Sequence, residues 1–290
     1  MVNSVEVRSY GRVFNEIADE YDRHRPAYSD ALVDRACEVA GLAPGATVLE
    51  IGCGTGQLTR SLLARGLRVV AVEPGEQLVA RARDQVAGAG AGEVQFVDAR
   101  LGEAPLPRAH CRAVFSASAI HWVDPDVSWR KIADALVDGG TVALLSYFGL
   151  QDSRSAEDQQ ALRAALARVA PDLASEWPIY RDLDGTLAGA AQRHDNVSEA
   201  WAWLGSYEVA RRYVPDLFGD VQIAAMPILV EHTADALNAL LGTMSFWARL
   251  APRQREALIA ENHALHQRLG RPIRSSTVAC LVTARRAART

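Results

Sequence analysis

The sequence predicts an α/β fold in which a doubly wound, seven-stranded and mostly parallel sheet carries helices on both faces. One observation is that short apolar segments alternate with helical segments between residues 47 and 147, which is the pattern of parallel β-α-β units. Another is that three glycines, at every second position, join the first apolar segment to a helix. The expected strands span residues 48–51, 68–72, 94–97, 113–117, 141–147, 221–230 and 276–284.

Helical patterns fill most of the intervals between these strands. In residues 12–40 the apolar side chains recur at helical spacing, but Pro26 interrupts them and Ser29 suits the N-cap of a second helix. Pro252 is well placed to begin another helix, because proline is favoured in the first turn. Further helices are expected at 57–65, 78–86, 128–136, 154–170, 234–250 and 252–269.

The alternation breaks after Phe148, and this break suggests how the chain is organised. We expect residues 1–45 to form an N-terminal helical lid. Residues 46–148 and 220–290 then form the sheet domain, and residues 149–219 form a helical insertion after the fifth strand. The insertion is rich in tryptophan and tyrosine and could supply the wall of a pocket.

Composition excludes several classes of protein. The 290 residues carry a formal net charge of −4 and 49% hydrophobic residues, so we expect a folded chain with no nucleic-acid partner. No segment is apolar enough to suggest a membrane helix or a secretory leader, which predicts a cytoplasmic protein, either monomer or homodimer. The four cysteines form no CxxC pair, and no residue cluster has the spacing of metal ligands, so no metal is expected.

The glycine-rich turn is the strongest local signal. Residues 47–57 read Thr-Val-Leu-Glu-Ile-Gly-Cys-Gly-Thr-Gly-Gln, a strand that runs into a turn and a helix. Such a turn brings bare backbone and the positive end of a helix against a ligand. A dinucleotide fingerprint needs a further glycine where Gln57 stands, and no P-loop lysine follows. Glu50 beside the turn would also repel phosphate, so the pattern favours a ligand without phosphate and with some positive charge.

The turn resembles that of the class I S-adenosylmethionine-dependent methyltransferases, and so do three later segments. These are Val-Glu-Pro at 72–74, Val-Asp-Ala at 97–99 and Leu-Val-Asp-Gly-Gly at 136–140. The resemblance is specific over residues 12–147 and is closest to the branch that modifies small molecules. It implies a Rossmann-like fold, S-adenosyl-L-methionine as cofactor and S-adenosyl-L-homocysteine as product.

The resemblance also implies roles for individual residues around the cofactor. The turn glycines would approach its amino-acid end and ribose, Glu50 would meet its ammonium group, and Glu73 would bind the ribose hydroxyls. Adenine would then lie against Pro74 and bond Asp98 and the Ala99 amide. The cofactor-binding residues expected on these grounds are Tyr21, Arg25, Glu50, Gly52, Gly54, Gly56, Glu73, Pro74, Asp98, Ala99, Ser116 and Ser118.

The acceptor is expected to be a small molecule with an O, N or C nucleophile, such as a secondary-metabolite intermediate. His121 follows the fourth strand, where it could act as a general base or simply pack beside the cofactor. The residues expected around the acceptor are Tyr28, His121, Trp122, Tyr147, Trp177 and Trp203.

Two other functions stay open at this point. Methyl transfer requires no particular catalytic residue, so the chain could bind the cofactor without methylating, either as a catalyst of another reaction or as a binding module. An NAD-dependent oxidoreductase is disfavoured by the residue at Gln57.

Overall fold

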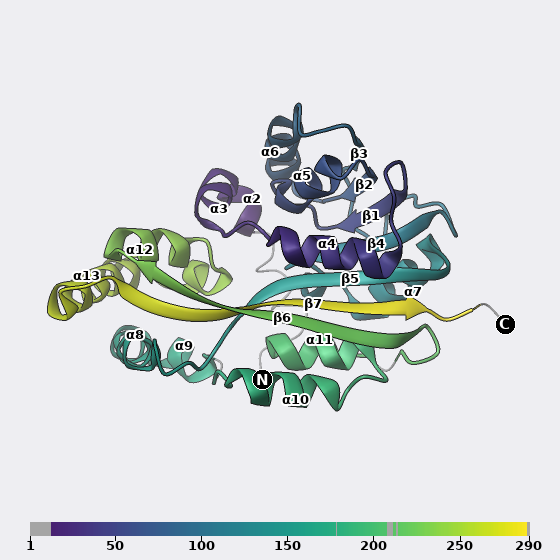
Figure 1. Cartoon of the computed structure of the whole chain (residues 1–290). Coiled ribbons are helices and arrows are strands. Elements are labelled where there is room, and N and C mark those ends of the chain that lie inside the picture. Colours follow the sequence, from purple (N-terminus) through teal and green to yellow (C-terminus); the bar gives the residue numbers. More distant parts are fainter. Residues whose placement is uncertain (1–12, 178, 208–210, 213, 289–290) are drawn as a thin grey trace.

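The computed structural model describes residues 13–177, 179–207, 211–212 and 214–288, and their centre is one twisted sheet (Figure 1). Its strands have the order β3-β2-β1-β4-β5-β7-β6, and β7 is antiparallel to its two neighbours. All seven expected strands are confirmed, although the last three are longer than predicted. The strands are β1 Thr47–Ile51, β2 Arg68–Val72, β3 Glu93–Val97, β4 Cys111–Ala117, β5 Leu136–Gly149, β6 Phe218–His232 and β7 Ile273–Arg286.

Helices cover both faces of this sheet, as expected. Val48 and Leu49 are both buried, but they point to opposite faces because side chains alternate along a strand. Val48 belongs to the core under α4 (Asp30–Ala40) and α5 (Gln57–Ala64), and α6 (Glu76–Val86) packs beside α5. Leu49 belongs to the core under α7 (Pro125–Ala135) and α11 (Val197–Gly205), with α10 (Leu183–Ala191) next to α11.

The long strands β5, β6 and β7 extend past the parallel part of the sheet and carry a second group of helices at their far end (Figure 1). This group, which we call the cap, consists of α8 (Ala156–Val169), α9 (Pro171–Glu176), α12 (Ala234–Gly242) and α13 (Pro252–Leu269). Helix α8 packs against both α9 and α13, and their shared core includes Leu166 and Leu258. The cap therefore combines two helices that precede β6 in the chain, α8 and α9, with two that follow it, α12 and α13. Helices α10 and α11 were expected to lie in the same insertion as α8, but they cover the sheet.

The N-terminal helices bridge the sheet domain and the cap. Helices α2 (Val13–Glu16) and α3 (Ala18–His24) contact α6, and α3 also contacts α12. Helix α12 ends at Gly242, earlier than the predicted helix 234–250, and a short 3-10 helix follows at Ser245–Arg249. Within the described ranges, no helix combines the length and apolar character needed to span a membrane.

Candidate functional site

The glycine turn that follows β1 is packed so closely at Gly52 and Gly56 that a larger residue would not fit at either position. Gly52 has φ +68°, and a Cβ added there would lie 2.3 Å from the Cβ of Ala119. Gly56 has φ +87°, and its added Cβ would lie 3.2 Å from the Cα of Ala82 on α6. The turn is thus held close to its neighbours on both sides, and Gly52 and Gly54 border a large cavity.

Glu73, at the end of β2, fixes the second wall of this cavity. Its carboxylate accepts hydrogen bonds from the backbone amides of Gly54, at 3.1 Å, and Gly75, at 2.9 Å. Burial raises the pKa of Glu73, while these two hydrogen bonds work in the opposite direction. The side chain is 7% exposed and borders the cavity, so its position and direction are set by the backbone around it.

The cavity has a volume of about 1840 Å³ and continues from the glycine turn into the cap. This exceeds the roughly 300–1,000 Å³ that is usual for one small ligand, so there is room for two ligands. Several elements surround it: the N-terminal helices, the carboxyl ends of the parallel strands, and the helices of the cap. Its expected residues are Tyr21, Arg25, Tyr28, Gly52, Gly54, Glu73, Pro74, Ser118, His121, Trp122, Tyr147 and Trp177.

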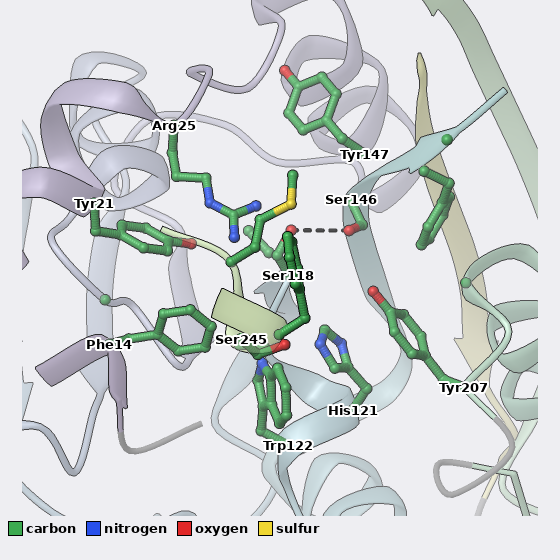
Figure 2. A pocket seen from close by; sticks show the side chains of 18 of the residues that line it. Phe14, Tyr21, Arg25, Ser118, His121, Trp122, Ser146, Tyr147, Tyr207 and Ser245 are labelled. Atoms are coloured by element: carbon green, nitrogen blue, oxygen red, sulfur yellow. Dashed lines mark hydrogen bonds between the residues drawn. The ribbon is translucent and has the colours of Figure 1, made fainter. Parts of the chain in front are cut away.

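Hydroxyl groups meet in the middle of the cavity (Figure 2). The Tyr28 hydroxyl donates to Ser118 Oγ at 2.9 Å, and Ser118 Oγ lies 2.9 Å from Ser146 Oγ. Burial raises the pKa of Tyr28 and raises that of Tyr207 to about 12, so both phenols remain protonated at neutral pH. The ring of Tyr147 stacks on Tyr28 at 5.6 Å between centroids, which holds the N-terminal segment against β5.

Arg25 brings a positive charge into the middle of the cavity, which we call the chamber (Figure 2). Its guanidinium lies over the ring of Tyr21, 5.3 Å from the centroid, and its Nη2 donates to the Thr243 carbonyl at 2.9 Å. The buried Nε has no hydrogen-bond partner among the described residues. Arg25 can therefore still donate to an anionic group that enters the cavity.

His121 is packed in a way that argues against a role as general base. It is 6% exposed, and its ring stacks on Tyr207 at 3.9 Å with an interplanar angle of 7°. Burial, helped by the charge of Arg25, lowers the pKa of His121 to about 3. An imidazole of such low basicity accepts a proton poorly at neutral pH, so the geometry favours the packing role that the sequence left open.

Six expected site residues do not border the cavity: Glu50, Gly56, Asp98, Ala99, Ser116 and Trp203. Glu50 faces α5 and accepts a hydrogen bond from Thr59 at 2.7 Å, so it does not reach into the cavity as expected. Asp98 is exposed and pairs with Arg83 at 3.3 Å.

The other departures from the expected site have similar causes. The Ser116 hydroxyl donates to the carbonyl of Ile51 inside the sheet, at 3.1 Å. Trp203 packs between Arg181 and Arg193 and bonds the Thr186 carbonyl at 3.2 Å, because α11 covers the sheet and does not enter the cap.

Sequence reasoning missed several residues that border the cavity, among them Phe14, Ser146 and Tyr207. Ser146 lies inside a buried strand, where nothing in the local pattern marks it. Tyr207 follows a helix that has no helical period in its apolar residues. Across the described part of the chain, no group of three or more His, Cys, Asp or Glu side chains could hold a metal ion.

Comparison with known proteins finds similarity to methyltransferases. Residues 49–144 match the family described as "Methyltransferase domain". The uncharacterized methyltransferase Rv3342 of Mycobacterium tuberculosis is 36% identical over 134 residues, which are 46% of this chain and 51% of that protein. The chain thus matches about half the length of this relative.

Solved structures share the fold at lower identity. One from Anaeromyxobacter dehalogenans, assigned as a type II methyltransferase, is 24% identical with a TM-score of 0.57, over 91% of this chain and 97% of that chain. The [4+2]-cyclase SpnF is 15% identical with a TM-score of 0.51, over 99% of this chain and 98% of that chain. These two likenesses concern the fold alone.

Proposed function

We propose that this chain, whose residues 49–144 match a methyltransferase domain, is a class I S-adenosylmethionine-dependent methyltransferase that transfers a methyl group to an O, N or C nucleophile of a small molecule. The observation that carries the proposal is the carboxylate of Glu73, held by the Gly54 and Gly75 amides at the edge of a cavity that can take a donor and an acceptor together. A secondary-metabolite intermediate is the acceptor class we favour. The chain would act in the cytoplasm as a monomer or homodimer, with no nucleic acid or membrane as partner.

The residues at the glycine turn fit S-adenosyl-L-methionine. Gly52 and Gly54 bring backbone to the wall of the cavity, and the oriented carboxylate of Glu73 can accept from two ribose hydroxyls. Pro74 and Leu101 offer apolar surface for a base. The Arg25 Nε, which lacks a partner in the described residues, can bond the carboxylate of the amino-acid end.

When bound, this cofactor supplies a methyl group on a sulfonium, which is already a good leaving group. The chain therefore has mainly to orient the acceptor and exclude water. The aromatic side chains around the chamber, among them Tyr28, Trp122 and Tyr147, can do both. With His121 too weakly basic to remove a proton, an acceptor that needs no deprotonation by the protein fits best.

Calorimetry and labelling test the proposal in two steps. Titration with S-adenosyl-L-homocysteine should show saturable binding, and NAD should show none. Radiolabel from methyl-labelled S-adenosyl-L-methionine should then appear in one or more members of a small-molecule acceptor library. Binding of NAD alone would overturn the proposal.

A second candidate function is separated by the same experiment. A chain that binds S-adenosyl-L-homocysteine but transfers no label to any acceptor would be a binding module or would catalyse a reaction without methyl transfer. The low basicity of His121 is compatible with this alternative, because a reaction without methyl transfer need not use it as a base.

A further inference from the structure

The part of the cavity that lies within the cap is apolar and is separate from the glycine turn, where the cofactor is proposed to bind. We call this part the cap arm. It begins beside Arg25, because the Arg25 guanidinium bonds Thr243 at the end of α12. From there the cavity continues between α8, α12 and α13. Side chains that border it in this arm are Leu162, Leu166, Leu237, Leu241, Phe246 and Leu258.

Asn262 of α13 interrupts this apolar lining. It is 0% exposed, and its Nδ2 donates to Asn238 Oδ1 of α12 at 2.7 Å. Both Asn262 Oδ1 and Asn238 Nδ2 are buried without a hydrogen-bond partner within the part of the chain that the structure describes. A buried amide left open in this way costs free energy, so its presence at a cavity wall calls for a ligand that completes it.

Three other polar groups in or next to the cap arm have hydrogen-bond partners. The Gln159 amide donates to the Leu150 carbonyl at 2.9 Å. His232 Nε2 lies 2.9 Å from the Ser275 hydroxyl, and the Ser155 hydroxyl donates to Ser276 at 2.8 Å. Asn262 differs from them, because it is a buried residue of the cavity wall whose amide oxygen has no hydrogen-bond partner among the described residues.

We propose that the cap arm binds the apolar body of an elongated amphipathic acceptor, and that Asn262 bonds a hydroxyl group of that acceptor far from the methylated atom. A hydroxyl suits the site because it can donate to the amide oxygen and also accept from an amide nitrogen. The apolar side chains supply affinity in proportion to the chain length they cover. The identification of the ligand as a methyl acceptor rests on the proposed function, but binding of a ligand in the arm can be measured without the cofactor.

The test uses octanoic, dodecanoic and hexadecanoic acids and their ω-hydroxy counterparts as probes. Each displaces anilinonaphthalene sulfonate from the purified full chain, and fluorescence reports the affinity. Affinity should rise with chain length, and for one length the ω-hydroxyl should tighten binding by about three- to tenfold. Asn262→Leu should abolish the gain from the hydroxyl and leave the unhydroxylated acids unchanged.

Two further variants keep the test decisive. Gln159→Leu alters a cavity amide that already has its partner, so the hydroxyl preference should survive. Leu241→Trp should block the arm and weaken the longer acids most, while S-adenosyl-L-homocysteine binding stays unchanged. Equal affinity at all lengths, or a hydroxyl preference that persists in Asn262→Leu, would overturn the inference. Failure to bind S-adenosyl-L-homocysteine would count against the proposed function only.

Discussion

The imidazole of His121 and the ring of Tyr207 lie face to face, with centroids 3.9 Å apart and an interplanar angle of 7°. His121 comes from the 3-10 turn after β4, and Tyr207 comes from the segment after α11, so the contact joins two distant parts of the chain. Both side chains border the cavity, where Figure 2 shows them next to each other. The relationship accounts for the low basicity of His121, since the stacked ring removes water from the imidazole.

His121 should make the protein less stable in acid. Its pKa falls from 6.5 to about 3 on folding because of burial, so below pH 6.5 the unfolded chain binds a proton that the folded chain does not. Stability is therefore lost as pH falls from 6.5 toward 3, at up to about 1.4 kcal/mol per pH unit. Urea unfolding of His121→Phe across this range should show a flatter profile than the wild type. An unchanged slope would mean that His121 titrates normally.

Glu50 should contribute the opposite pH dependence. Burial raises its pKa from 4.5 to about 7, against the hydrogen bond from Thr59. The folded chain then binds a proton that the unfolded chain has lost, so stability falls as pH rises from 4.5 to 7. Glu50→Gln keeps an acceptor for Thr59 and removes the charge, so it should raise the free energy of unfolding at pH 7 and above. Denaturant melts at pH 5 and pH 8 provide the measurement, and a variant less stable than wild type at pH 8 would contradict it.

The sequence was sufficient to place all seven strands, because parallel buried strands are short, apolar and bounded by turns or helices. The sequence did not predict the helices that are buried on most sides. Helix α11 reads Val-Ser-Glu-Ala-Trp-Ala-Trp-Leu-Gly, so its apolar residues show no single face, and the predicted insertion could not be divided between sheet and cap. Gly52 and Glu73 border the cavity, since strand ends fix their place, and their role in cofactor binding stays a prediction.

Glu50 and Asp98 were expected at the cofactor but do not border the cavity, for a different reason. Position along a strand determines where a residue lies, but the partner that its side chain finds decides where it points. The buried side chain of Glu50 accepts a hydrogen bond from Thr59, and the exposed carboxylate of Asp98 forms an ion pair with Arg83. The cap arm was likewise hidden, because Asn238 and Asn262 meet only after α12 and α13 have packed.

Gly52→Ala should be far more damaging than an alanine at another left-handed glycine. The new Cβ would lie 2.3 Å from the Cβ of Ala119, in addition to the strain of φ +68°. Gly139 provides the control, with φ +69° and no atom within 4 Å of an added Cβ. We expect Gly139→Ala to cost about 1–2 kcal/mol from backbone strain and Gly52→Ala to cost at least about 2 kcal/mol more from overpacking. Equal midpoints of unfolding in urea would show that the turn has room to shift.

Glu73→Gln should separate cofactor binding from stability. The Gly54 and Gly75 amides each donate to one carboxylate oxygen of Glu73. Glutamine has one oxygen that can accept from one of them, but its NH₂ group would face the other, and the negative charge is lost. We expect S-adenosyl-L-homocysteine to bind at least about tenfold more weakly, because hydrogen bonds to a charged group contribute about 1.5–3 kcal/mol each. Glu76→Gln, at the exposed start of α6, serves as the matched control and should bind like the wild type. Isothermal titration of both variants, with thermal unfolding to confirm that each is folded, decides the matter: equal affinities would remove Glu73 from the cofactor site and leave the family match without its main structural support.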